Sequence, residues 1–465
     1  MSLSMTNWKS IYFVGIGGIG MSALARWFNA NGFHVAGYDK TETILVQTLV
    51  TEGIPVNFED EVASIPTEFT NDPDQTLIIY TPAVPVHHKQ MNFFKQENFM
   101  ILKRSQVLGI LTKNMRTIGV AGTHGKTTTS SLVAHILRDA GVNSTAFLGG
   151  ITQNYGTNLL LNEPTENLED VICVVEADEF DRSFLTLFPE IAIVTSTDAD
   201  HLDIYGEHEA VLESFCEYVS QIEDEGALFM RSGLTIASAT KAKVFTYSRN
   251  DGDYHAENIT IENARFVFDL VYAGGSINRI AMRIPGYHNI ENSIAAGAVA
   301  LYVGVDSAKI KDALESYRGV KRRFEYQIEE EGRVYIDDYA HHPTEIEAFL
   351  SSVKALYPGR HVTAIFQPHL YSRTRDFADG FSESLSIADR VILLEIYPAR
   401  ELPIEGVNAE MLLDKISGSD KCLTPKGDVL EHLKGLDLDV VVTIGAGDID
   451  TLVLPIKNLL RSTVY

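Results

Sequence analysis

Short apolar runs alternate with amphipathic stretches along the first third of the chain. Residues 11–14 and 34–38 are apolar runs of strand length, and residues 21–29 between them have apolar positions at helical spacing. A strand, a helix and a second strand in succession are typical of a βαβ unit with parallel strands. The pattern therefore predicts a parallel, Rossmann-like sheet at the start of the chain.

The same alternation resumes in the middle of the chain. Apolar runs occur at 117–121, 171–176 and 191–196, and a helical stretch lies at 130–139. This succession again indicates parallel strands joined through helices. It predicts a central domain with a nucleotide-binding core of its own.

A two-residue period replaces this pattern between about residues 250 and 285. The runs 265–272 and 280–284 flank Gly274 and Gly275, so we expect a β-hairpin there. A helical stretch follows at 292–303.

After a basic run at 321–323 the parallel pattern returns for a third time. We expect strands at 334–337, 361–366, 391–395 and 440–444, and a helix at 346–356. A chain of 465 residues exceeds what one hydrophobic core usually organises. The sequence therefore predicts an α/β protein of three domains, formed by residues 1–113, 114–325 and 326–465.

Composition excludes several classes of protein. The chain has 45% hydrophobic and 22% charged residues, as ordinary globular proteins do, and lacks an apolar run of about 18 residues, so we expect no membrane insertion. Its formal charge of −25 repels polyanions, which argues against nucleic-acid binding. Three cysteines, an odd number without metal-ligand spacing, predict a reducing, cytoplasmic location.

A glycine-rich loop follows the first predicted strand. Gly15, Gly17 and Gly20 form the pattern G-x-G-x-x-G before a helix, and Asp39 ends the next strand. Such glycines let backbone N–H groups approach a pyrophosphate, and the acid can accept a hydrogen bond from a ribose hydroxyl. The motif indicates either NAD in an oxidoreductase or a UDP-sugar, unless the loop is only a tight turn.

A second glycine loop joins the strand at 117–121 to a helix and reads Gly122-Thr123-His124-Gly125-Lys126-Thr127-Thr128. Lys126 can neutralise the β and γ phosphates of ATP, and the Thr127 hydroxyl can reach a magnesium ion. The full P-loop pattern has a glycine where this chain has Val120. We expect ATP as a co-substrate; a nucleotide-binding switch without turnover is the alternative.

Carboxylates follow the next two predicted strands. The first strand leads to Glu176, Asp178 and Glu179, and the second leads to Asp198, Asp200, His201 and Asp203. Because ligands bind at the carboxyl ends of parallel strands, these side chains are expected beside the P-loop. Hard oxygen ligands suit magnesium. We expect the metal ligands to be Thr127, Glu176 and His201.

Taken together, these motifs resemble the Mur ligases along nearly the whole chain. The segments that carry the resemblance are Gly-Ile-Gly-Gly-Ile-Gly at 15–20, Gly-Thr-His-Gly-Lys-Thr-Thr-Thr at 122–129, Glu-Ala-Asp-Glu-Phe-Asp at 176–181, Asp-His-Leu-Asp at 200–203, His-Asn-Ile-Glu-Asn at 288–292, Asp-Asp-Tyr-Ala-His-His-Pro-Thr-Glu at 337–345 and Gln-Pro-His at 367–369. The resemblance implies an N-terminal Rossmann-like UDP-binding domain, a central P-loop ATPase domain and a C-terminal Rossmann-like domain that closes over an amino acid.

The resemblance also implies roles for individual residues. The UDP-sugar would be bound by Gly15, Gly17, Gly18, Gly20 and Asp39. ATP would be bound by residues 122–128 with Asn289, Asn292 and Arg323, and the amino acid by Tyr339, His341, Arg373 and Arg375. Lys126, His341 and Arg373 would be catalytic, with two magnesium ions at the metal ligands. The resemblance is compatible with a homodimer.

Two departures from the family pattern bear on the reaction. Ligases that add later residues carry a carbamoylated lysine 14 positions after the metal histidine, where this chain has Phe215. Many relatives have arginine in place of Leu370, so Arg373 or Arg375 would bind the substrate carboxylate. The first departure fits the member that adds L-alanine to UDP-N-acetylmuramate in peptidoglycan precursor synthesis. A recycling ligase that attaches a murein peptide to the same sugar is the alternative.

The chemistry implied is the activation of a carboxylate. Transfer of the γ-phosphoryl group of ATP to the muramoyl carboxylate would give an acyl phosphate, which the amine of alanine would attack. The amine must first lose a proton, and an imidazole titrates in the right range. His341 is our hypothesis for the base, with His124 and His342 as alternatives.

Overall fold

The computed structural model describes residues 8–113, 115–165, 167–198, 205–399, 401–418 and 420–462. Its contacts divide the chain into two compact units. The first comprises Met1–His255, Leu270–Ser276 and Asn292–Leu314, and the second comprises Ala256–Asp269, Ile277–Glu291 and Glu315–Tyr465. Among the helices of the described residues, none combines the length and the apolar character that a membrane span needs.

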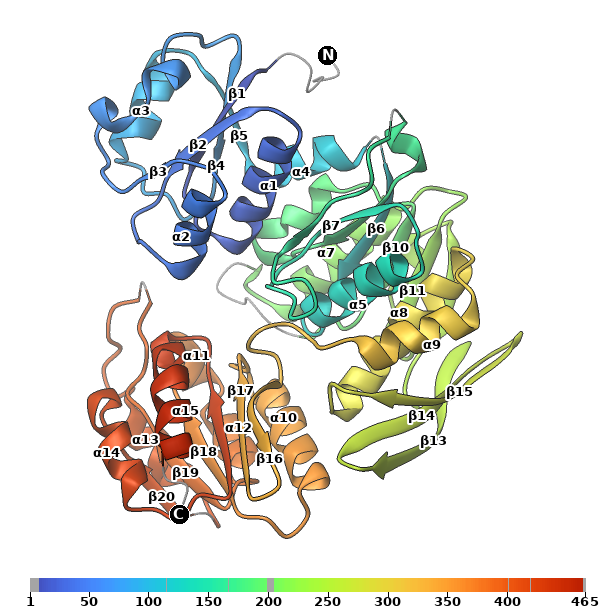
Figure 1. The fold of residues 1–465 in the computed structure, drawn as a ribbon, viewed down its shortest axis with the longest axis vertical. Coiled ribbons are helices and arrows are strands. Elements are labelled where there is room, and N and C mark those ends of the chain that lie inside the picture. Colours follow the sequence, from blue (N-terminus) through green and yellow to red (C-terminus); the bar gives the residue numbers. More distant parts are fainter. Residues whose placement is uncertain are drawn as a thin grey trace. The chain divides into compact units, whose positions relative to one another are not determined.

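The N-terminal sheet has five parallel strands in the order β3-β2-β1-β4-β5 (Figure 1). The strands are β1 (Ser10–Val14), β2 (His34–Tyr38), β3 (Val56–Asn57), β4 (Thr76–Tyr80) and β5 (Met100–Lys103), and the helices are α1 (Ile19–Ala30), α2 (Ile44–Thr51), α3 (Lys89–Gln96) and α4 (Arg104–Thr112). Strand order reverses direction between β1 and β4. In open α/β sheets ligands bind outside the carboxyl ends of the strands at such a switch point.

The central sheet has seven strands in the order β12-β11-β10-β6-β9-β7-β8, and within the described residues its strand pairs are parallel except for the antiparallel β7–β8 pair. Its strands are β6 (Arg116–Ala121), β7 (Ser144–Phe147), β8 (Leu159–Leu160), β9 (Ile172–Glu176), β10 (Ile191–Val194), β11 (Ala227–Arg231) and β12 (Lys243–Tyr247). Helices α5 (Lys126–Asp139) and α7 (His208–Ser220) belong to it. Because β6 lies between β9 and β10, the loops after these three strands meet at one edge.

One cluster of buried apolar side chains runs through the first unit. It includes Ile11 and Phe28 of the N-terminal sheet and its helix, and Val175 and Tyr218 of the central domain. A smaller cluster around Tyr12 and Phe94 covers the other face of the N-terminal sheet. The N-terminal and central sheets therefore share a continuous core, while the domain boundary near residue 113 stays a prediction.

A separate sheet of three strands has the order β13-β14-β15. Its strands are β13 (Tyr254–Glu262), β14 (Arg265–Tyr272) and β15 (Gly275–Met282). The hairpin predicted around Gly274 joins β14 to β15, and Gly275 adopts a φ of +149° there. Helices α8 (Tyr287–Tyr302) and α9 (Ser307–Ser316) follow.

The C-terminal sheet has the order β16-β17-β21-β18-β19-β20, with an antiparallel β16–β17 pair and parallel pairs elsewhere. Its strands are β16 (Glu325–Glu330), β17 (Arg333–Asp338), β18 (Val362–Phe366), β19 (Arg390–Leu393), β20 (Asp420–Leu423) and β21 (Val440–Ile444). Its helices are α10 (Pro343–Leu356), α11 (Tyr371–Asp376), α12 (Ala378–Leu385), α13 (Ala409–Lys415), α14 (Val429–Lys434) and α15 (Val453–Ser462). The third parallel pattern in the sequence is thus confirmed.

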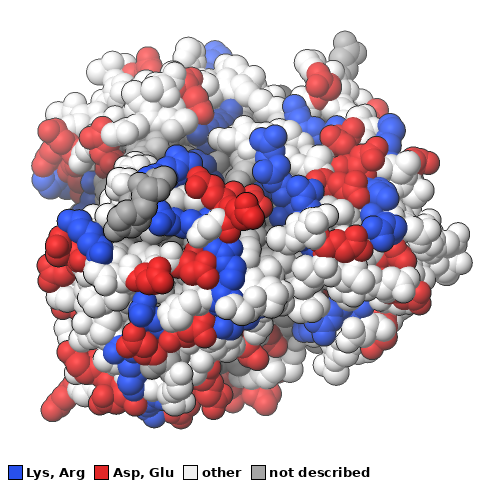
Figure 2. All heavy atoms as spheres, turned by 60° about the horizontal axis from the view of Figure 1, so that its bottom comes forward, with Lys and Arg blue, Asp and Glu red and all other residues white. Residues whose placement is uncertain are grey.

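Charged side chains of both signs are interspersed on the molecular face drawn in Figure 2. Although the net charge is −25, that face is therefore not uniformly acidic. A mixed surface of this kind favours solubility more than it defines a partner.

Candidate functional site

The first glycine loop is held in shape by strand β2 and by Asp39. The N–H groups of Gly15 and Ile16 donate to Tyr38 O at 2.8 and 3.0 Å, and Gly17 N donates to Asp39 Oδ2 at 2.8 Å. Gly15 has a φ of +86°, which favours glycine. Asp39 therefore braces the loop itself, and the contact with uridine that the resemblance implies stays a prediction.

Helix α1 begins directly after this loop without a side-chain cap. Gly18 is its N-cap, and no side chain accepts a hydrogen bond from its first turn in the described structure. Uncapped N–H groups at a helix N-terminus attract anions. The predicted diphosphate site at 15–20 thus lies at an uncapped helix N-terminus, and its contact with a diphosphate stays a prediction.

The P-loop lies between β6 and α5. Gly122 has a φ of +133°, and a Cβ atom there would lie 2.0 Å from Thr195 Oγ1, so a side chain does not fit. Gly125, with a φ of +82°, immediately precedes α5, which begins at Lys126. Val120 is fully buried inside β6 and lies outside the loop, which explains why a glycine is not needed at that position.

Lys126 is folded back onto the loop. Its Nζ atom donates to Gly122 O at 2.7 Å and to Glu179 Oε1 at 2.8 Å, and only 1% of the Glu179 side chain is exposed. Burial by itself lowers the pKa of Lys126, but the carboxylates of Glu179, Asp178 and Glu176 outweigh it and raise that pKa above its ordinary value. Lys126 is therefore a held, protonated cation at the start of α5.

Thr127 and Glu176 meet beside the P-loop. Thr127 Oγ1 donates to Glu176 Oε1 at 3.1 Å, and Gly149 N donates to Glu176 Oε2 at 3.1 Å. A Cβ atom on Gly149 would lie 2.2 Å from Glu176 Oε2, so this glycine makes room for the carboxylate. A hydroxyl and a carboxylate oxygen at one point fit the ligand preference of Mg²⁺.

The third predicted metal ligand, His201, lies outside the described residues, as do Asp200 and Asp203. The described residues contain no cluster of three His, Cys, Asp or Glu side chains that could hold a metal ion by themselves. The metal site therefore stays a prediction for which Thr127 and Glu176 supply two compatible ligands.

The loop after β10 fixes the P-loop from the other side. Ser196 Oγ lies 2.8 Å from Thr123 Oγ1 and accepts a hydrogen bond of 2.8 Å from His124 N. Asp198 N donates to Thr123 Oγ1 at 3.1 Å, and His124 Nε2 lies 3.6 Å from Asp198 Oδ2. Hydrogen bonds from the loop after β10 thus hold the P-loop, which follows β6, in its conformation.

The two asparagines assigned to ATP occupy different environments on α8. Asn292 Oδ1 accepts a hydrogen bond of 3.2 Å from Thr129 and lies 2.8 Å from the place of a Cβ on Gly125, so it contacts the start of α5. Asn289 Nδ2 donates to Pro285 O at 2.7 Å and braces the start of α8. Their contacts with adenine stay predictions.

Asn158 ties the first turn of α1 to the central domain. Its Nδ2 atom donates to Ile19 O at 2.5 Å and to Ser22 Oγ at 3.0 Å, and its Oδ1 atom accepts from Arg26. The side chain is fully buried. The glycine loop therefore has a fixed position relative to the strand ends of the central sheet.

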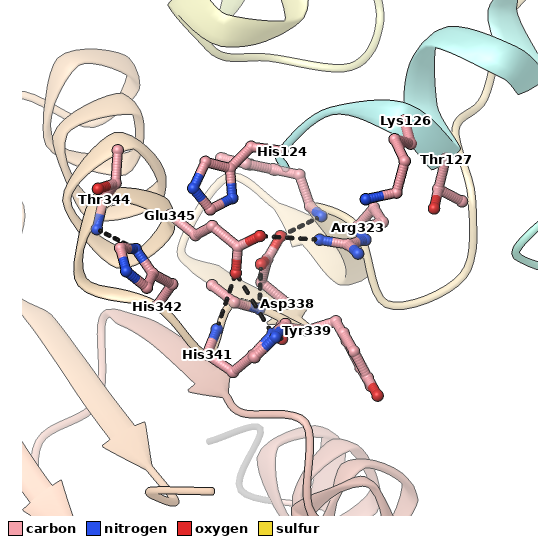
Figure 3. A network of polar contacts seen from close by, with 12 residues as sticks. His124, Lys126, Thr127, Arg323, Asp338, Tyr339, His341, His342, Thr344 and Glu345 are labelled. Carbon is pink, nitrogen blue, oxygen red and sulfur yellow. Dashed lines mark hydrogen bonds and ion pairs between the residues drawn. The ribbon is translucent and has the colours of Figure 1, made fainter. Parts of the chain in front are cut away.

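The second unit begins with a clamp on the basic run at 321–323. Arg322 Nε bonds to the buried Asp337 at 3.0 Å, and Phe324 N donates to Asp338 Oδ2 at 2.7 Å. Arg323 is held more loosely, with its guanidinium 3.9 Å from Glu345 and 5.3 Å from the Tyr339 ring (Figure 3). Of the two arginines, Arg323 is thus the one whose donors remain more available to a ligand.

His341 lies on the loop after β17, next to Glu345. Glu345 Oε2 accepts from His341 N at 3.0 Å and lies 3.3 Å from His341 Nδ1, while Nδ1 is 3.1 Å from Tyr339 O (Figure 3). Burial lowers the pKa of His341 below 6.5, and Glu345 opposes this effect while Arg373 and Arg323 reinforce it. The imidazole is therefore neutral near pH 7 and can accept a proton.

The two candidate arginines of α11 differ in exposure. The positive charge of Arg373 helps to lower the pKa of His341, so the guanidinium lies near that imidazole. The Arg375 side chain is 54% exposed and pairs with the neighbouring Asp376 at 2.7 Å. Between them, Arg373 has the better position for a substrate carboxylate, and both roles stay predictions.

Several residues of the site have no counterpart among the predicted site residues. They are Gly149, Asn158, Ser196 and Glu345, and Glu179 was predicted only as one of the carboxylates after the strand at 171–176. Ser196 and Glu345 lie within or beside recognised motifs, so their position is a usable signal. Gly149 and Asn158 lie outside every motif, and they act through contacts with residues that are distant in the sequence.

Three family models match consecutive parts of the chain. Residues 10–116 match "Mur ligase family, catalytic domain", residues 120–300 match "Mur ligase middle domain", and residues 322–447 match "Mur ligase, glutamate ligase domain".

Known proteins resemble the chain over its whole length. A UDP-N-acetylmuramate--L-alanine ligase of Cytophaga hutchinsonii is 47% identical over 98% of both chains, and one of Flavobacterium johnsoniae is 48% identical over 99% of this chain and 100% of its own. The crystal structure of a UDP-N-acetylmuramate-alanine ligase from Thermotoga maritima has a TM-score of 0.81 at 26% identity, covering 98% of this chain and 100% of that one. A murein peptide ligase from Psychrobacter arcticus, at 23% identity and a TM-score of 0.69 over the same shares, has the same fold.

Proposed function

The chain belongs to the Mur ligase family, and we propose that it joins L-alanine to the carboxylate of UDP-N-acetylmuramate while ATP is converted to ADP and phosphate. This is an ATP-dependent, amide-bond-forming reaction of peptidoglycan precursor synthesis. The observation that carries the proposal furthest is that Lys126, which is paired with Glu179, adjoins the Thr127–Glu176 hydrogen bond at neighbouring strand ends. A phosphate-holding cation beside metal-compatible oxygens is what phosphoryl transfer requires.

The first step makes the carboxylate reactive. An oxygen of the muramoyl carboxylate attacks the γ-phosphorus of ATP, the bond to the β–γ bridging oxygen breaks, and ADP leaves. The products of this step are ADP and an acyl phosphate. Lys126 supports the transfer because its ammonium offsets the negative charge on the phosphoryl oxygens. When bound by Thr127, Glu176 and His201, Mg²⁺ would add further positive charge at the triphosphate.

The second step forms the amide. The amine of alanine attacks the acyl carbon, a tetrahedral intermediate forms, and phosphate leaves with the bonding electrons. The amine attacks only as the free base, so a group has to accept its proton. We assign this role to His341, since its partly buried imidazole is neutral near pH 7 and Glu345 lies against it. Arg373 is assigned to the alanine carboxylate.

Alanine is favoured over a murein peptide by the relatives of this chain. Those at 47 and 48% identity are named as alanine ligases, whereas the likeness to the peptide ligase is one of fold. Phe215 agrees with this assignment, because it is fully buried and packs against Phe184 at a ring distance of 5.3 Å. The position that holds a lysine in other ligases is here part of the core.

Release of orthophosphate tests the proposal. Purified protein with Mg²⁺, ATP, UDP-N-acetylmuramate and L-alanine should release phosphate, and omission of either the nucleotide sugar or alanine should abolish the release. A competition assay between alanine and a murein tripeptide as acceptors distinguishes the alanine ligase from the recycling ligase. The peptide should not support phosphate release. A change of absorbance at 340 nm with NADH in place of ATP would indicate the oxidoreductase instead. Cytoplasmic location and a homodimer stay predictions.

A further inference from the structure

Arg104 begins α4 and faces a cavity beside the glycine loop. The cavity has a volume of about 90 Å³. Its polar lining comes from Arg104, Glu176 and Asp178, and its remaining walls come from Gly20, Gly149 and apolar side chains of α1, α4 and β7. The cavity therefore lies between the predicted diphosphate loop and the predicted metal ligand Glu176, all within the first unit.

The guanidinium of Arg104 has donors to offer. Its NH2 atom lies 3.6 Å from Asp178 Oδ2, which is an ion pair but too long for a good hydrogen bond. Within the part of the chain that the structure describes, the side chain makes no hydrogen bond. A guanidinium carries five N–H donors in a planar fork that matches a carboxylate. With 26% of its side chain exposed, Arg104 can bind an anion from the cavity.

Gly20 makes this position of the arginine possible. A Cβ atom on Gly20 would lie 2.3 Å from Arg104 NH1 and 3.1 Å from its Cδ and Cζ atoms. The third glycine of the G-x-G-x-x-G pattern thus gives space to a cation as well as to the helix. Because α1 has no side-chain cap, its first N–H groups lie on the same positive edge.

The opposite side of the cavity is acidic. Glu176 and Asp178 line it, and the nearby Lys126 is already paired with Glu179. An incoming carboxylate would be repelled there unless a cation of the site bound it. Arg104 is the cation that lines the cavity.

We propose that Arg104 binds the lactyl carboxylate of UDP-N-acetylmuramate and holds it beside Glu176, where phosphoryl transfer takes place. This inference rests on the proposed function and adds to it a residue that determines specificity for the nucleotide sugar. UDP-N-acetylglucosamine has the same nucleotide and sugar ring but lacks the lactyl group. Arg104 would therefore decide which of the two is preferred.

Binding of the two nucleotide sugars to the full chain, measured by calorimetry without ATP, tests the proposal. Arg104→Met should bind UDP-N-acetylmuramate about 10- to 100-fold more weakly, since a charge-assisted hydrogen-bond pair is lost. Its affinity for UDP-N-acetylglucosamine should stay within about twofold of the unchanged protein, which also shows that the variant is folded. Arg104→Lys should give an intermediate loss, because an ammonium keeps the charge without the fork.

The matched control is Lys103→Met, which removes an exposed cation one position away and should change neither affinity. An equal loss for both nucleotide sugars in Arg104→Met would assign the arginine to the diphosphate and overturn the proposal. An unchanged affinity for both would overturn it as well. Failure of the proposed function is recognised separately, since the unchanged protein would then release no phosphate, whatever the result of the binding comparison.

Discussion

The ammonium of Lys126 and the carboxylate of Glu179 are buried against one another, with 13% and 1% of their side chains exposed. Breaking a buried pair leaves an uncompensated charge, which is far more costly than exchanging the pair for neutral groups. The same lysine thus has two separable effects, one on folding and one on the reaction. A single substitution would mix them.

Lys126→Met should therefore lose both stability and activity. We expect a fall of about 3–5 kcal/mol in the free energy of unfolding from the buried charge of Glu179, and a loss of at least about 100-fold in kcat for phosphate release. Chemical denaturation and a phosphate assay measure the two quantities.

The double variant Lys126→Met with Glu179→Gln provides the control. It should regain most of the stability, because no buried charge remains, but none of the activity. Recovery of phosphate release in the double variant would contradict the role assigned to Lys126.

His341 makes the reaction depend on pH. A general base acts only when neutral, so activity falls as the pH drops through its pKa. Because burial lowers that pKa below 6.5, the acid limb of kcat against pH should lie below pH 6.5. In His341→Ala, kcat at saturating alanine should fall roughly 100-fold and this limb should disappear. A rise in the KM for alanine alone would instead make His341 a binding residue. The control is His361→Ala, which changes an exposed histidine immediately before β18.

Leu370 is the strained residue of the second unit. Its backbone has a φ of +68° and a ψ of 137°, a combination that residues other than glycine rarely adopt. Its N–H group donates to Tyr397 O at 3.0 Å, and its carbonyl accepts from Thr374. These bonds hold the strained turn immediately before α11, which carries Arg373. The structure therefore gives Leu370 a role in placing that helix, although it supplies no charge.

At the scale of elements, the strand ends of the central sheet determine the site. Strands β6, β9 and β10 are neighbours, so the P-loop, Glu176 and Ser196 come from three consecutive positions in one sheet. The loop after β7 adds Gly149, whose N–H group binds Glu176. A backbone atom from a fourth element thus orients the predicted metal ligand.

Gly149→Ala tests that arrangement. The added methyl group would lie 2.2 Å from Glu176 Oε2 and would displace the carboxylate. We expect kcat to fall roughly 100-fold, since small displacements of reacting groups have effects of that size. The concentration of Mg²⁺ needed for half-maximal phosphate release should rise. Gly332→Ala, where a Cβ atom meets nothing within 4 Å, is the control, and equal behaviour of the two variants would count against the role of Gly149.

For the whole molecule, the shared core and Asn158 make the N-terminal and central sheets one unit, distinct from the second unit. Scanning calorimetry should therefore resolve two transitions. Asn158→Ala should lower the free energy of unfolding of the first unit by roughly 1–3 kcal/mol, because buried hydrogen bonds to α1 are lost. The midpoint temperature of the first unit's transition should rise when ATP is added, because the P-loop belongs to this unit. A single transition that shifts as a whole would show that the two units do not unfold independently.

The sequence by itself determined the features that depend on neighbours along the chain. The parallel strands, the two glycine loops and the acidic strand ends follow from short-range patterns, because a strand or a phosphate-binding turn is specified by a few consecutive residues. Their order along the chain was enough to indicate the family and a ligase reaction. Val120, where the full P-loop pattern has a glycine, lies inside β6.

Only the tertiary structure decided which distant groups meet. Lys126 pairs with a carboxylate 53 positions away, Asn158 bonds to a carbonyl 139 positions away, and Arg104 lies against Gly20. Each of these contacts depends on how sheets and helices pack against one another, and short-range patterns in the sequence do not specify which distant residues meet. For the same reason a lone arginine such as Arg104 reads as an ordinary surface cation until the fold places it beside a cavity.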